Sequence, residues 1–300
     1  MDASDLKVFE AVAEAGGMSR AAERLNTVQS NVTARLRALE DELGQPLFYR
    51  HSRGVALTPA GRRLLPYAAR VRALLVEARR AVADDGAPSG PLIVGSLETT
   101  AALRLAPMLA AFATTHPAVD LSLITGTTAE LIDGVLERRL EAAFVCGPVE
   151  HPELIEEAMF QEELVLATAP GVASIDALIG TGETRIVVLR IGCSYRQRLE
   201  DVLVRRGVAG LRRLEFGTID GLVACVGAGL GVTLLPRGIV EPAWLAGRVA
   251  VHDLPAAESR VITACVRRRD GLVTSTLVAF LQAARPQPSQ GRAGSREAAD

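Results

Sequence analysis

The segment SRAAERLNTVQSNVTARLRALE, residues 19–40, decides the fold of the N-terminal part of this chain. Its two adjacent alanines allow one helix to cross another closely, and Leu25 and Val32 can close an apolar core between the helices. Asn26 and Thr27 interrupt the helical pattern only briefly. Two helices joined by so short a turn form the helix-turn-helix arrangement.

The outer face of the second of these predicted helices, residues 29–43, carries short hydrogen-bonding side chains and arginines near its N-terminal end. Such groups reach base edges and phosphates when a helix N-terminus lies in the major groove of DNA. A polar helix that simply faces solvent is the alternative interpretation. The outward residues are Gln29, Ser30, Asn31, Thr33, Ala34, Arg35 and Arg37.

The sequence on either side of this segment fits a small basic module. A first helix is predicted over residues 4–15, and a hairpin, or wing, over 46–57 with arginines near its tip. Between Met18 and Arg80 the chain has 12 arginines and 5 acidic residues, a local charge of +7 in a chain of net charge −2. This local basic charge indicates a DNA-facing module. A solvated helical face is the alternative.

The composition excludes several classes of protein. Hydrophobic residues make up 49% and charged residues 23% of the 300 residues, which is ordinary for two or three globular units. The four cysteines are widely separated and lack nearby paired histidines, so we expect neither a disulfide scaffold nor a metal site. The sequence shows no signal peptide and no apolar run of the ~18 residues that a membrane span needs. We therefore expect a cytoplasmic protein without membrane contact.

Residues 59–85 are predicted to form one long helix, because Thr58 and Pro59 are favourable as N-cap and first helical residue. Apolar residues recur along this segment at alternating four- and three-residue steps, which is a heptad seam. We expect the same helix of a second subunit as the partner. Packing against the chain's own C-terminal domain is the alternative. The seam residues are Leu64, Ala68, Val71, Leu75, Ala78 and Val82.

From residue 92 onward, short apolar strands alternate with helices, after a hinge-like segment DGAPSGP at 85–91. This alternation predicts parallel sheets covered by helices on both faces. Residues 286–300 are small and polar, so we expect a disordered tail. Strands are predicted over 92–95, 119–124, 142–145, 164–168, 186–190, 232–235 and 261–266.

Many spaced positions in residues 5–65 together form a recognisable pattern. They are Leu6-x-x-Phe9, Ala21-Ala22-Glu23-x-Leu25, Gln29-Ser30-x-Val32-Thr33, Leu39-Glu40-x-Glu42-Leu43-Gly44-x-Pro46-Leu47-Phe48-x-Arg50 and Leu57-Thr58-x-x-Gly61. With this pattern the chain resembles the LysR-type transcriptional regulators over nearly its whole length. The resemblance implies an α/β protein with an all-α winged helix-turn-helix, a long linker helix and a periplasmic-binding-protein-like domain of two Rossmann-like subdomains.

The resemblance also implies domain boundaries. They are 1–58 for the winged helix-turn-helix, 59–88 for the linker helix and hinge, 89–285 for the effector-binding domain and 286–300 for the tail. Within the effector-binding domain, subdomain I covers about 90–160 with 267–285, and subdomain II covers about 161–266.

By the same resemblance, the recognition helix and the wing contact double-stranded DNA. Val28 and Ala34 depart from residues that are common in the family, which leaves the target sequence open. We expect Gln29→Ala to relax base preference and Arg53→Ala to weaken binding to every sequence. The predicted DNA-binding residues are Arg20, Gln29, Ser30, Asn31, Thr33, Arg35, Arg37 and Arg53.

An effector site is expected in the cleft between the subdomains, because ligands of open α/β sheets lie beyond strand C-termini and beside helix N-termini. As the alternative, each serine or threonine there caps its own helix. The predicted effector residues are Ser96, Glu98, Thr99, Thr100, Thr127, Thr128, Gly147, Cys193, Ser194, Arg196 and Thr218.

Two of these residues raise specific hypotheses. A buried Glu98 would need a cation, which favours a polyamine or amino-acid-like effector, whereas an exposed Glu98 would favour none. Cys193 lies at a predicted helix N-terminus near Arg196, an environment that lowers a thiol pKa. A thiol-based redox-responsive regulator of the same fold is therefore the alternative function, and a small packed residue is the simpler interpretation.

The sequence does not predict an enzyme, because its four histidines are scattered and no catalytic motif is present. We expect no cofactor and no metal, only a small-molecule co-inducer. The expected partners are double-stranded DNA, the effector, a second copy in a homodimer or dimer of dimers, and RNA polymerase. A solute-binding protein and a non-specific DNA-compacting protein are more remote alternatives.

Overall fold

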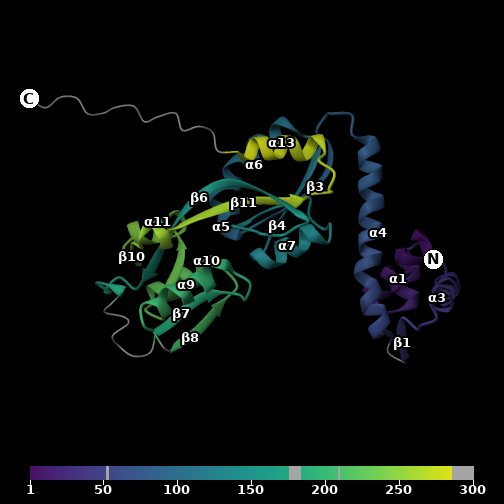
Figure 1. The fold of residues 1–300 in the computed structure, drawn as a ribbon, viewed down its shortest axis with the longest axis horizontal. Helices are drawn as coiled ribbons and strands as arrows, with labels where there is room; N and C mark the ends of the chain where they lie inside the picture. Colours follow the sequence, from purple (N-terminus) through teal and green to yellow (C-terminus); the bar gives the residue numbers. More distant parts are fainter. Residues whose placement is uncertain (52–53, 176–183, 209, 286–300) are drawn as a thin grey trace, which may run out of the picture. The chain divides into compact units, whose positions relative to one another are not determined.

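The computed structural model describes residues 1–51, 54–175, 184–208 and 210–285. Arg53 and the predicted tail 286–300 lie outside these described residues. The chain divides into two compact units, one of Met1–Asp85 with Glu137–Arg139, the other of Gly86–Leu136 and the residues from Leu140 onward. Figure 1 shows the elements of each unit.

The first unit begins with three short helices, α1 (Ala3–Ala15), α2 (Met18–Arg24) and α3 (Gln29–Leu43). Their bounds agree with the sequence prediction to within about one residue. Asp2 caps α1 through the backbone amides of Ser4 and Asp5, and the Asp5 carboxylate accepts from the Asp2 amide in return. The helices enclose one apolar core of Phe9, Val12, Ala21, Val32, Leu36 and Leu39.

The wing follows as two antiparallel strands, β1 (Phe48–His51) and β2 (Gly54–Leu57). Glu40 of α3 braces it. One carboxylate oxygen accepts the backbone amides of Leu47 and Phe48 at 2.8 and 3.3 Å, and the other pairs with Arg50 at 2.9 Å. These contacts give a physical reason for the Leu39-Glu40 and Pro46-Leu47-Phe48 parts of the sequence pattern.

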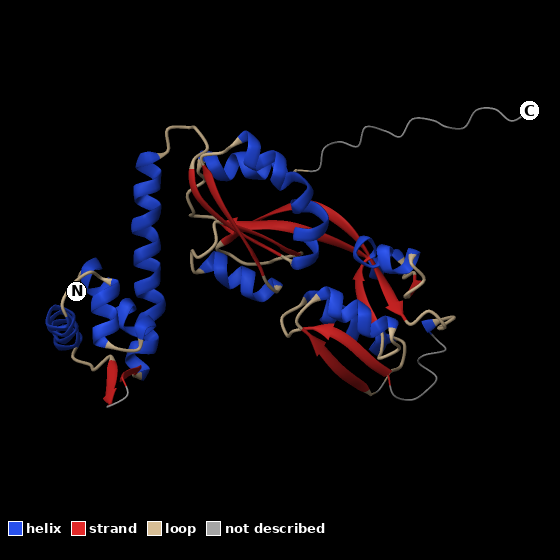
Figure 2. Ribbon diagram, turned by 180° about the vertical axis from the view of Figure 1, so that it is seen from behind, coloured by secondary structure: helices blue, strands red, loops and turns tan. Residues whose placement is uncertain are grey.

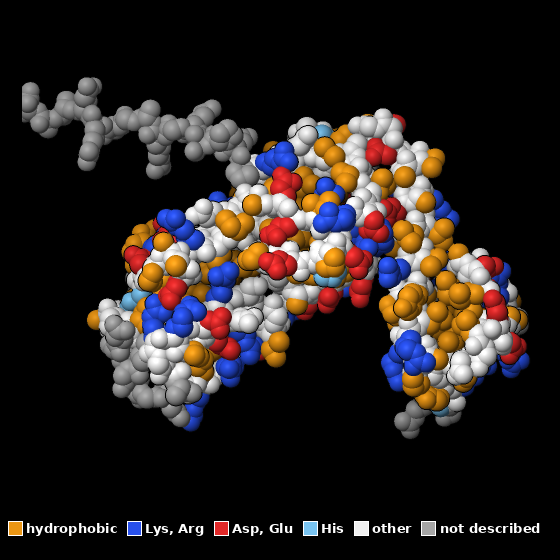
Figure 3. Space-filling model, in the orientation of Figure 1, with side chains coloured by type: hydrophobic (Ala, Val, Ile, Leu, Met, Phe, Trp, Pro, Cys, Tyr) orange, Lys and Arg blue, Asp and Glu red, His pale blue; other side chains and the backbone are white. Residues whose placement is uncertain are grey.

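The long helix α4 (Pro59–Ala83) is capped by Thr58, as the sequence predicts. The sequence analysis assigned the whole heptad seam to contact with a second subunit, and this is wrong for the N-terminal seam residues. Ala68 is completely buried within its own unit, and Leu64 and Val71 pack against the same core. Leu75 and its apolar neighbours farther along remain exposed, and Figure 3 shows hydrophobic side chains reaching the surface over α4.

The second unit begins with a parallel sheet in which β3 (Gly90–Ser96) pairs with both β4 (Val119–Thr125) and β5 (Ala142–Cys146). The helical segment between β3 and β4 comprises α5 (Glu98–Thr100), a π-helical turn η1 (Ala101–Leu105) and α6 (Ala106–Thr115). Helices α7 (Thr128–Leu136) and α13 (Ser275–Ala284) also belong to this half. Phe112, Phe144 and Phe280 form the centre of its core.

Two long strands connect the halves of the second unit, β6 (Leu154–Thr168) and β11 (Arg260–Arg268). They pair antiparallel from Arg260 opposite Glu163 to Arg268 opposite Leu154. The expectation of parallel sheets is confirmed for the pairings of β3 with β4 and β5. It is wrong for β6 and β11, which run in opposite directions through a seven-stranded sheet of order β10-β6-β11-β5-β3-β4, with β9 paired to β6. Figure 2 shows these strands in red between the blue helices.

The other half holds a parallel pair, β7 (Thr184–Leu189) and β8 (Leu211–Phe216), with helices α9 (Ser194–Arg205) and α10 (Ile219–Gly227). Strands β9 (Thr233–Pro236) and β10 (Ala250–His252) pair antiparallel with β6, and α11 (Arg237–Leu245) and α12 (Ala256–Ser259) complete this half. The predicted strands did not include β8 or β10. Among the described residues, no helix is both long enough and apolar enough to cross a bilayer.

Candidate functional sites

A hollow on the first unit lies between the N-terminal parts of α2 and α3 and the wing. Three of the predicted DNA-binding residues, Arg20, Gln29 and Thr33, line it together. Ser19, Arg50 and His51 line it as well and were not predicted. The full lining is Gly16, Gly17, Met18, Ser19, Arg20, Gln29, Thr33, Arg50, His51, Gly54 and Val55.

Helix α3 presents its first turn to this surface. Gln29, Ser30 and Asn31 are exposed, and Thr33 is half-buried. Val28 occupies the N-cap position and supplies no side-chain hydrogen bond, so the first backbone amides of α3 remain available to an anion. Gln29 accepts a hydrogen bond from Ser19 Oγ at 3.0 Å, and Asn31 Nδ2 donates to Thr27 Oγ1 at 3.0 Å.

The predicted arginines differ in their exposure and in whether another side chain holds them. Arg37 is exposed, and Arg20 bends back over the Gly16-Gly17 turn, with Nη2 3.2 Å from where a Gly16 Cβ would lie. Arg35 is held by Asp5 of α1 at 3.2 Å and is only half-exposed. Its guanidinium can reach DNA only with the donors that Asp5 leaves free. The wing arginine, Arg53, lies outside the described residues.

A recess in the second unit lies where the C-terminal ends of β3, β4, β7 and β8 meet, and it has about 490 Å³ of open space including its mouth. Four predicted effector residues line it: Glu98, Thr99, Thr127 and Cys193. The set of predicted effector residues did not include the other eight. They are Leu97, Thr125, Gly126, Leu189, Arg190, Tyr195, Phe216 and Gly217.

The remaining predicted effector residues do not line this recess. Ser96 is fully buried and donates to the Leu97 carbonyl, and Thr100 is buried. Thr218 caps α10 through the Gly221 amide, as the capping alternative proposed.

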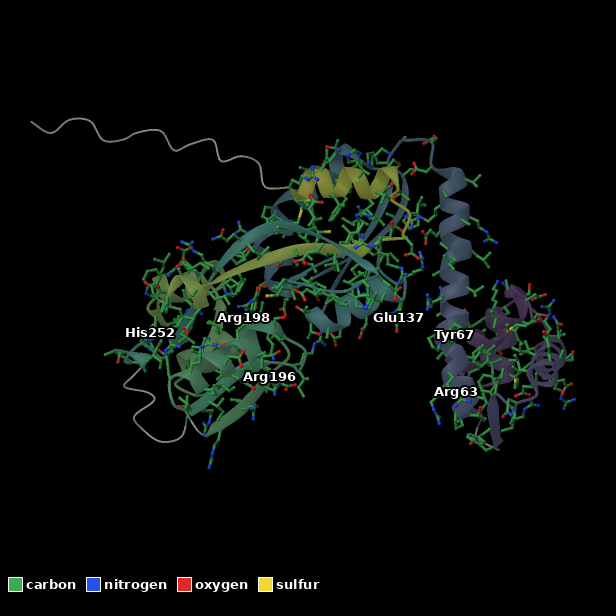
Figure 4. The ribbon with its side chains drawn as sticks, viewed as in Figure 1. Arg63, Tyr67, Glu137, Arg196, Arg198 and His252 are labelled. Carbon is green, nitrogen blue, oxygen red and sulfur yellow. The ribbon has the colours of Figure 1, made fainter. Side chains whose placement is uncertain are left out.

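Gly147 lies against Glu156 and Ala264. Arg196, labelled in Figure 4, extends from α9 to Glu215 at 2.9 Å. Thr128 and Ser194 bond to each other at 2.9 Å.

Two polar contacts join the two halves of the unit beside the recess. The Thr99 and Tyr195 hydroxyls are 3.5 Å apart, and Ser194 Oγ donates to Thr128 Oγ1. Burial raises the pKa of Tyr195 above its ordinary value, so the phenol stays neutral at physiological pH. The recess is lined from both halves, by residues that end or follow β3 and β4 and by residues that end or follow β7 and β8.

Two carboxylates lie at or near the recess, and they differ in whether a cationic side chain pairs with them. Arg190 pairs with Glu130 at 3.2 Å, and Glu130 also accepts the Thr127 amide at 2.9 Å. The hydrogen bond from the Thr127 amide and the charge of Arg190 lower the pKa of Glu130, which therefore stays ionised. Glu98 is half-buried at the recess, and among the described residues no cationic side chain pairs with it. The recess thus contains one carboxylate that a ligand could neutralise.

Cys193 does not have the activated environment that its sequence position predicts. It is a free thiol at the N-cap position of α9, and the amides of Arg196 and Tyr195 favour its thiolate. Burial nevertheless outweighs these amides and raises the pKa of Cys193. The expected lowering of the pKa was wrong. The redox hypothesis for Cys193 was based mainly on that lowered pKa, so it loses its main support.

Comparisons with known proteins cover both the N-terminal and the C-terminal part of the chain. The profile of the family described as "Bacterial regulatory helix-turn-helix protein, lysR family" matches residues 3–62, and that of the "LysR substrate binding domain" matches residues 85–288. The HTH-type transcriptional regulator GltR of Bacillus subtilis is 43% identical over 276 residues, covering 92% of this chain and 93% of GltR. The HTH-type transcriptional regulator YofA of Bacillus velezensis is 39% identical, covering 96% and 99%.

Solved structures show the same architecture. Full-length CbnR in complex with its target DNA is similar with a TM-score of 0.67 and 26% identity, covering 95% of this chain and 99% of CbnR. A full-length OxyR from Pseudomonas aeruginosa has a TM-score of 0.67 at 21% identity, covering 95% and 94%, which shows a common fold. The chain therefore belongs to the LysR family of transcriptional regulators, with a DNA-binding helix-turn-helix domain followed by an effector-binding domain.

Proposed function

We propose that this regulator binds a promoter duplex as a homodimer or dimer of dimers, with the first turn of α3 in the major groove. The observation that carries this proposal is the shared hollow in which Gln29, Thr33 and the wing meet. In this mode the exposed amide and hydroxyl groups read bases, and arginines such as Arg37 hold phosphates. The protein acts in the cytoplasm, by binding and not by catalysis, and it needs no metal or cofactor. Its DNA-bound form contacts RNA polymerase.

Replacing Gln29 by Ala tests the reading of bases. Gln29 is exposed at the start of α3, so its loss removes a base contact of about 1–3 kcal/mol without disturbing the core. We expect affinity for a duplex selected by the wild-type protein to fall by that amount, while affinity for random duplex changes little. Fluorescence anisotropy on both duplexes measures the two values.

Gln45→Ala is the matched control, because Gln45 is an exposed glutamine after the end of α3 and does not line the hollow. It should leave both affinities unchanged. Equal losses on the selected and the random duplex with Gln29→Ala would mean that Gln29 does not read bases.

We further propose that the recess of the second unit binds the co-inducer, and that this molecule carries an amine. The half-buried Glu98 carboxylate supports this proposal, because a partly desolvated charge is stabilised by an opposite charge. Arg190 lies in the same lining, and the guanidinium donors that Glu130 leaves free suit a carboxylate of an amino-acid-like molecule. A ligand that contacts both halves binds one arrangement of them better than another, and this difference in affinity shifts the population of DNA-bound states.

The amine proposal predicts the effect of neutralising Glu98. Calorimetry with short diamines and amino acids should detect a ligand whose affinity falls about 10-fold or more in Glu98→Gln, because a charged hydrogen bond of about 1.5–3 kcal/mol is weakened. Glu150→Gln, on an exposed glutamate that does not line the recess, should bind the ligand normally. Tight binding of a dicarboxylate of equal length, with no binding of any amine, would contradict the proposal.

A further inference from the structure

Ser19 and Gln29 are ten residues apart in sequence and are joined by a hydrogen bond across the turn between α2 and α3. Ser19 Oγ donates to Gln29 Oε1 at 3.0 Å. Both side chains are exposed, and both line the hollow. The bond therefore lies on the surface that faces DNA in the proposed function.

This bond uses the oxygen of the Gln29 amide and leaves its NH2 group without a partner among the described residues. A glutamine amide has an acceptor oxygen with two lone pairs and an NH2 group with two donor hydrogens. Ser19 engages one lone pair of the oxygen and thereby points the oxygen toward α2, and among the described residues no hydrogen bond engages Nε2. Gln29 therefore presents hydrogen-bond donors to a ligand in the hollow, while its acceptor is turned toward α2.

We propose that Ser19 is a positioning residue that sets the base preference of Gln29. The proposal rests on the proposed base-reading role of Gln29 and adds the reason for its choice of base. Adenine is read by a glutamine that offers an acceptor to N6 and a donor to N7. Guanine offers two adjacent acceptors, N7 and O6. A Gln29 whose oxygen is held by Ser19 matches guanine better than adenine.

The experiment uses the full-length protein and duplexes selected from a random library by the wild type. The position that Gln29 contacts is identified as the base pair whose preference disappears in Gln29→Ala. Four duplexes that differ only at this pair are then titrated with wild type, Ser19→Ala, Ser19→Thr and the Ser19→Ala/Gln29→Ala double variant. The measured quantity is the ratio of the affinity for guanine to that for adenine.

We expect the wild type to prefer guanine, and Ser19→Ala to lower the ratio roughly 2- to 10-fold, the range of one net hydrogen bond. Ser19→Thr keeps a hydroxyl and should retain the wild-type ratio. The double variant should match Gln29→Ala alone, because Ser19 acts through Gln29. Thermal melting of Ser19→Ala verifies that the domain stays folded.

Three outcomes would overturn the inference. Ser19→Ala could weaken all four duplexes equally, which would make Ser19 a phosphate contact or a structural residue. The wild type could prefer adenine at this position, which would mean that the amide oxygen faces the base. If Gln29→Ala leaves every base preference intact, the proposed role of Gln29 itself fails, and the role of Ser19 fails with it.

Discussion

Leu75→Glu is expected to lower the affinity for a duplex with two half-sites by about 100-fold or more, because two heads joined in a dimer gain 10²–10⁴ in avidity. Leu75 lies on α4 with 45% of its surface exposed, and Leu74, Val76 and Val82 nearby are exposed by 47%, 46% and 90%. An apolar surface of this kind on a helix is stabilised when a second copy covers it. A buried, unpaired glutamate would oppose that association.

Two measurements check this result together. Analytical ultracentrifugation should show that Leu75→Glu shifts the protein to monomers, and anisotropy should show that its affinity for a single half-site is retained. Leu245→Glu is the matched control, because Leu245 is 76% exposed on α11. A Leu75→Glu variant that remains dimeric and binds the paired site normally would show that the exposed part of α4 is not the dimer contact. Tyr67 and Arg63, labelled in Figure 4, are further exposed positions on α4 to test.

Gly61→Ala is expected to destabilise the DNA-binding domain by about 3 kcal/mol, at the upper end of the cost of overpacking. A Cβ at Gly61 would lie 2.3 Å from the Leu47 carbonyl oxygen and 2.9 Å from Leu57 Cδ2. The leucine side chain can move, but the carbonyl belongs to the backbone entering the wing. Thr58 fixes the same place, since its hydroxyl accepts the Gly61 amide at 3.0 Å and donates to the Pro46 carbonyl at 2.7 Å.

Urea unfolding, followed by circular dichroism, gives the free energy of unfolding of Gly61→Ala and of its control. Gly171→Ala is the control, because no heavy atom lies within 4 Å of its Cβ position and its φ is not positive. The control should change stability by less than about 0.5 kcal/mol, as surface substitutions usually do. A Gly61→Ala protein as stable as the wild type would show that α4 and the wing segment can separate without cost.

The elements that the sequence determined are those with a strong local signal. The apolar spacing of α1, α2 and α3 depends only on which helical face is buried, so it could be read without knowing the partner. The same holds for the Thr58 cap and for buried strands such as β5, whose five residues are all buried. In the recess, Glu98, Thr99, Thr127 and Cys193 could be found because each follows a strand C-terminus.

Long-range contacts decided the rest. Strand β6 is 15 residues long, yet only its last five were predicted, because LIEEAMFQEE before them is partly charged and becomes a strand by pairing with β11. Tyr195 and Phe216 reach the recess from α9 and β8. Arg35 is held by Asp5 thirty residues away, and Ala68 is buried by its own unit rather than exposed for a dimer.

Cys193 shows why some properties could be predicted from local sequence and others could not. Its place at a helix N-terminus is a local property, and from that property alone a lowered pKa is expected. Desolvation depends on every segment packed around the thiol, and in the folded protein desolvation is the larger effect. Local periodicity and capping therefore determined which segments are helices and strands, whereas burial, ion pairing and the membership of each site were decided only when distant segments packed together.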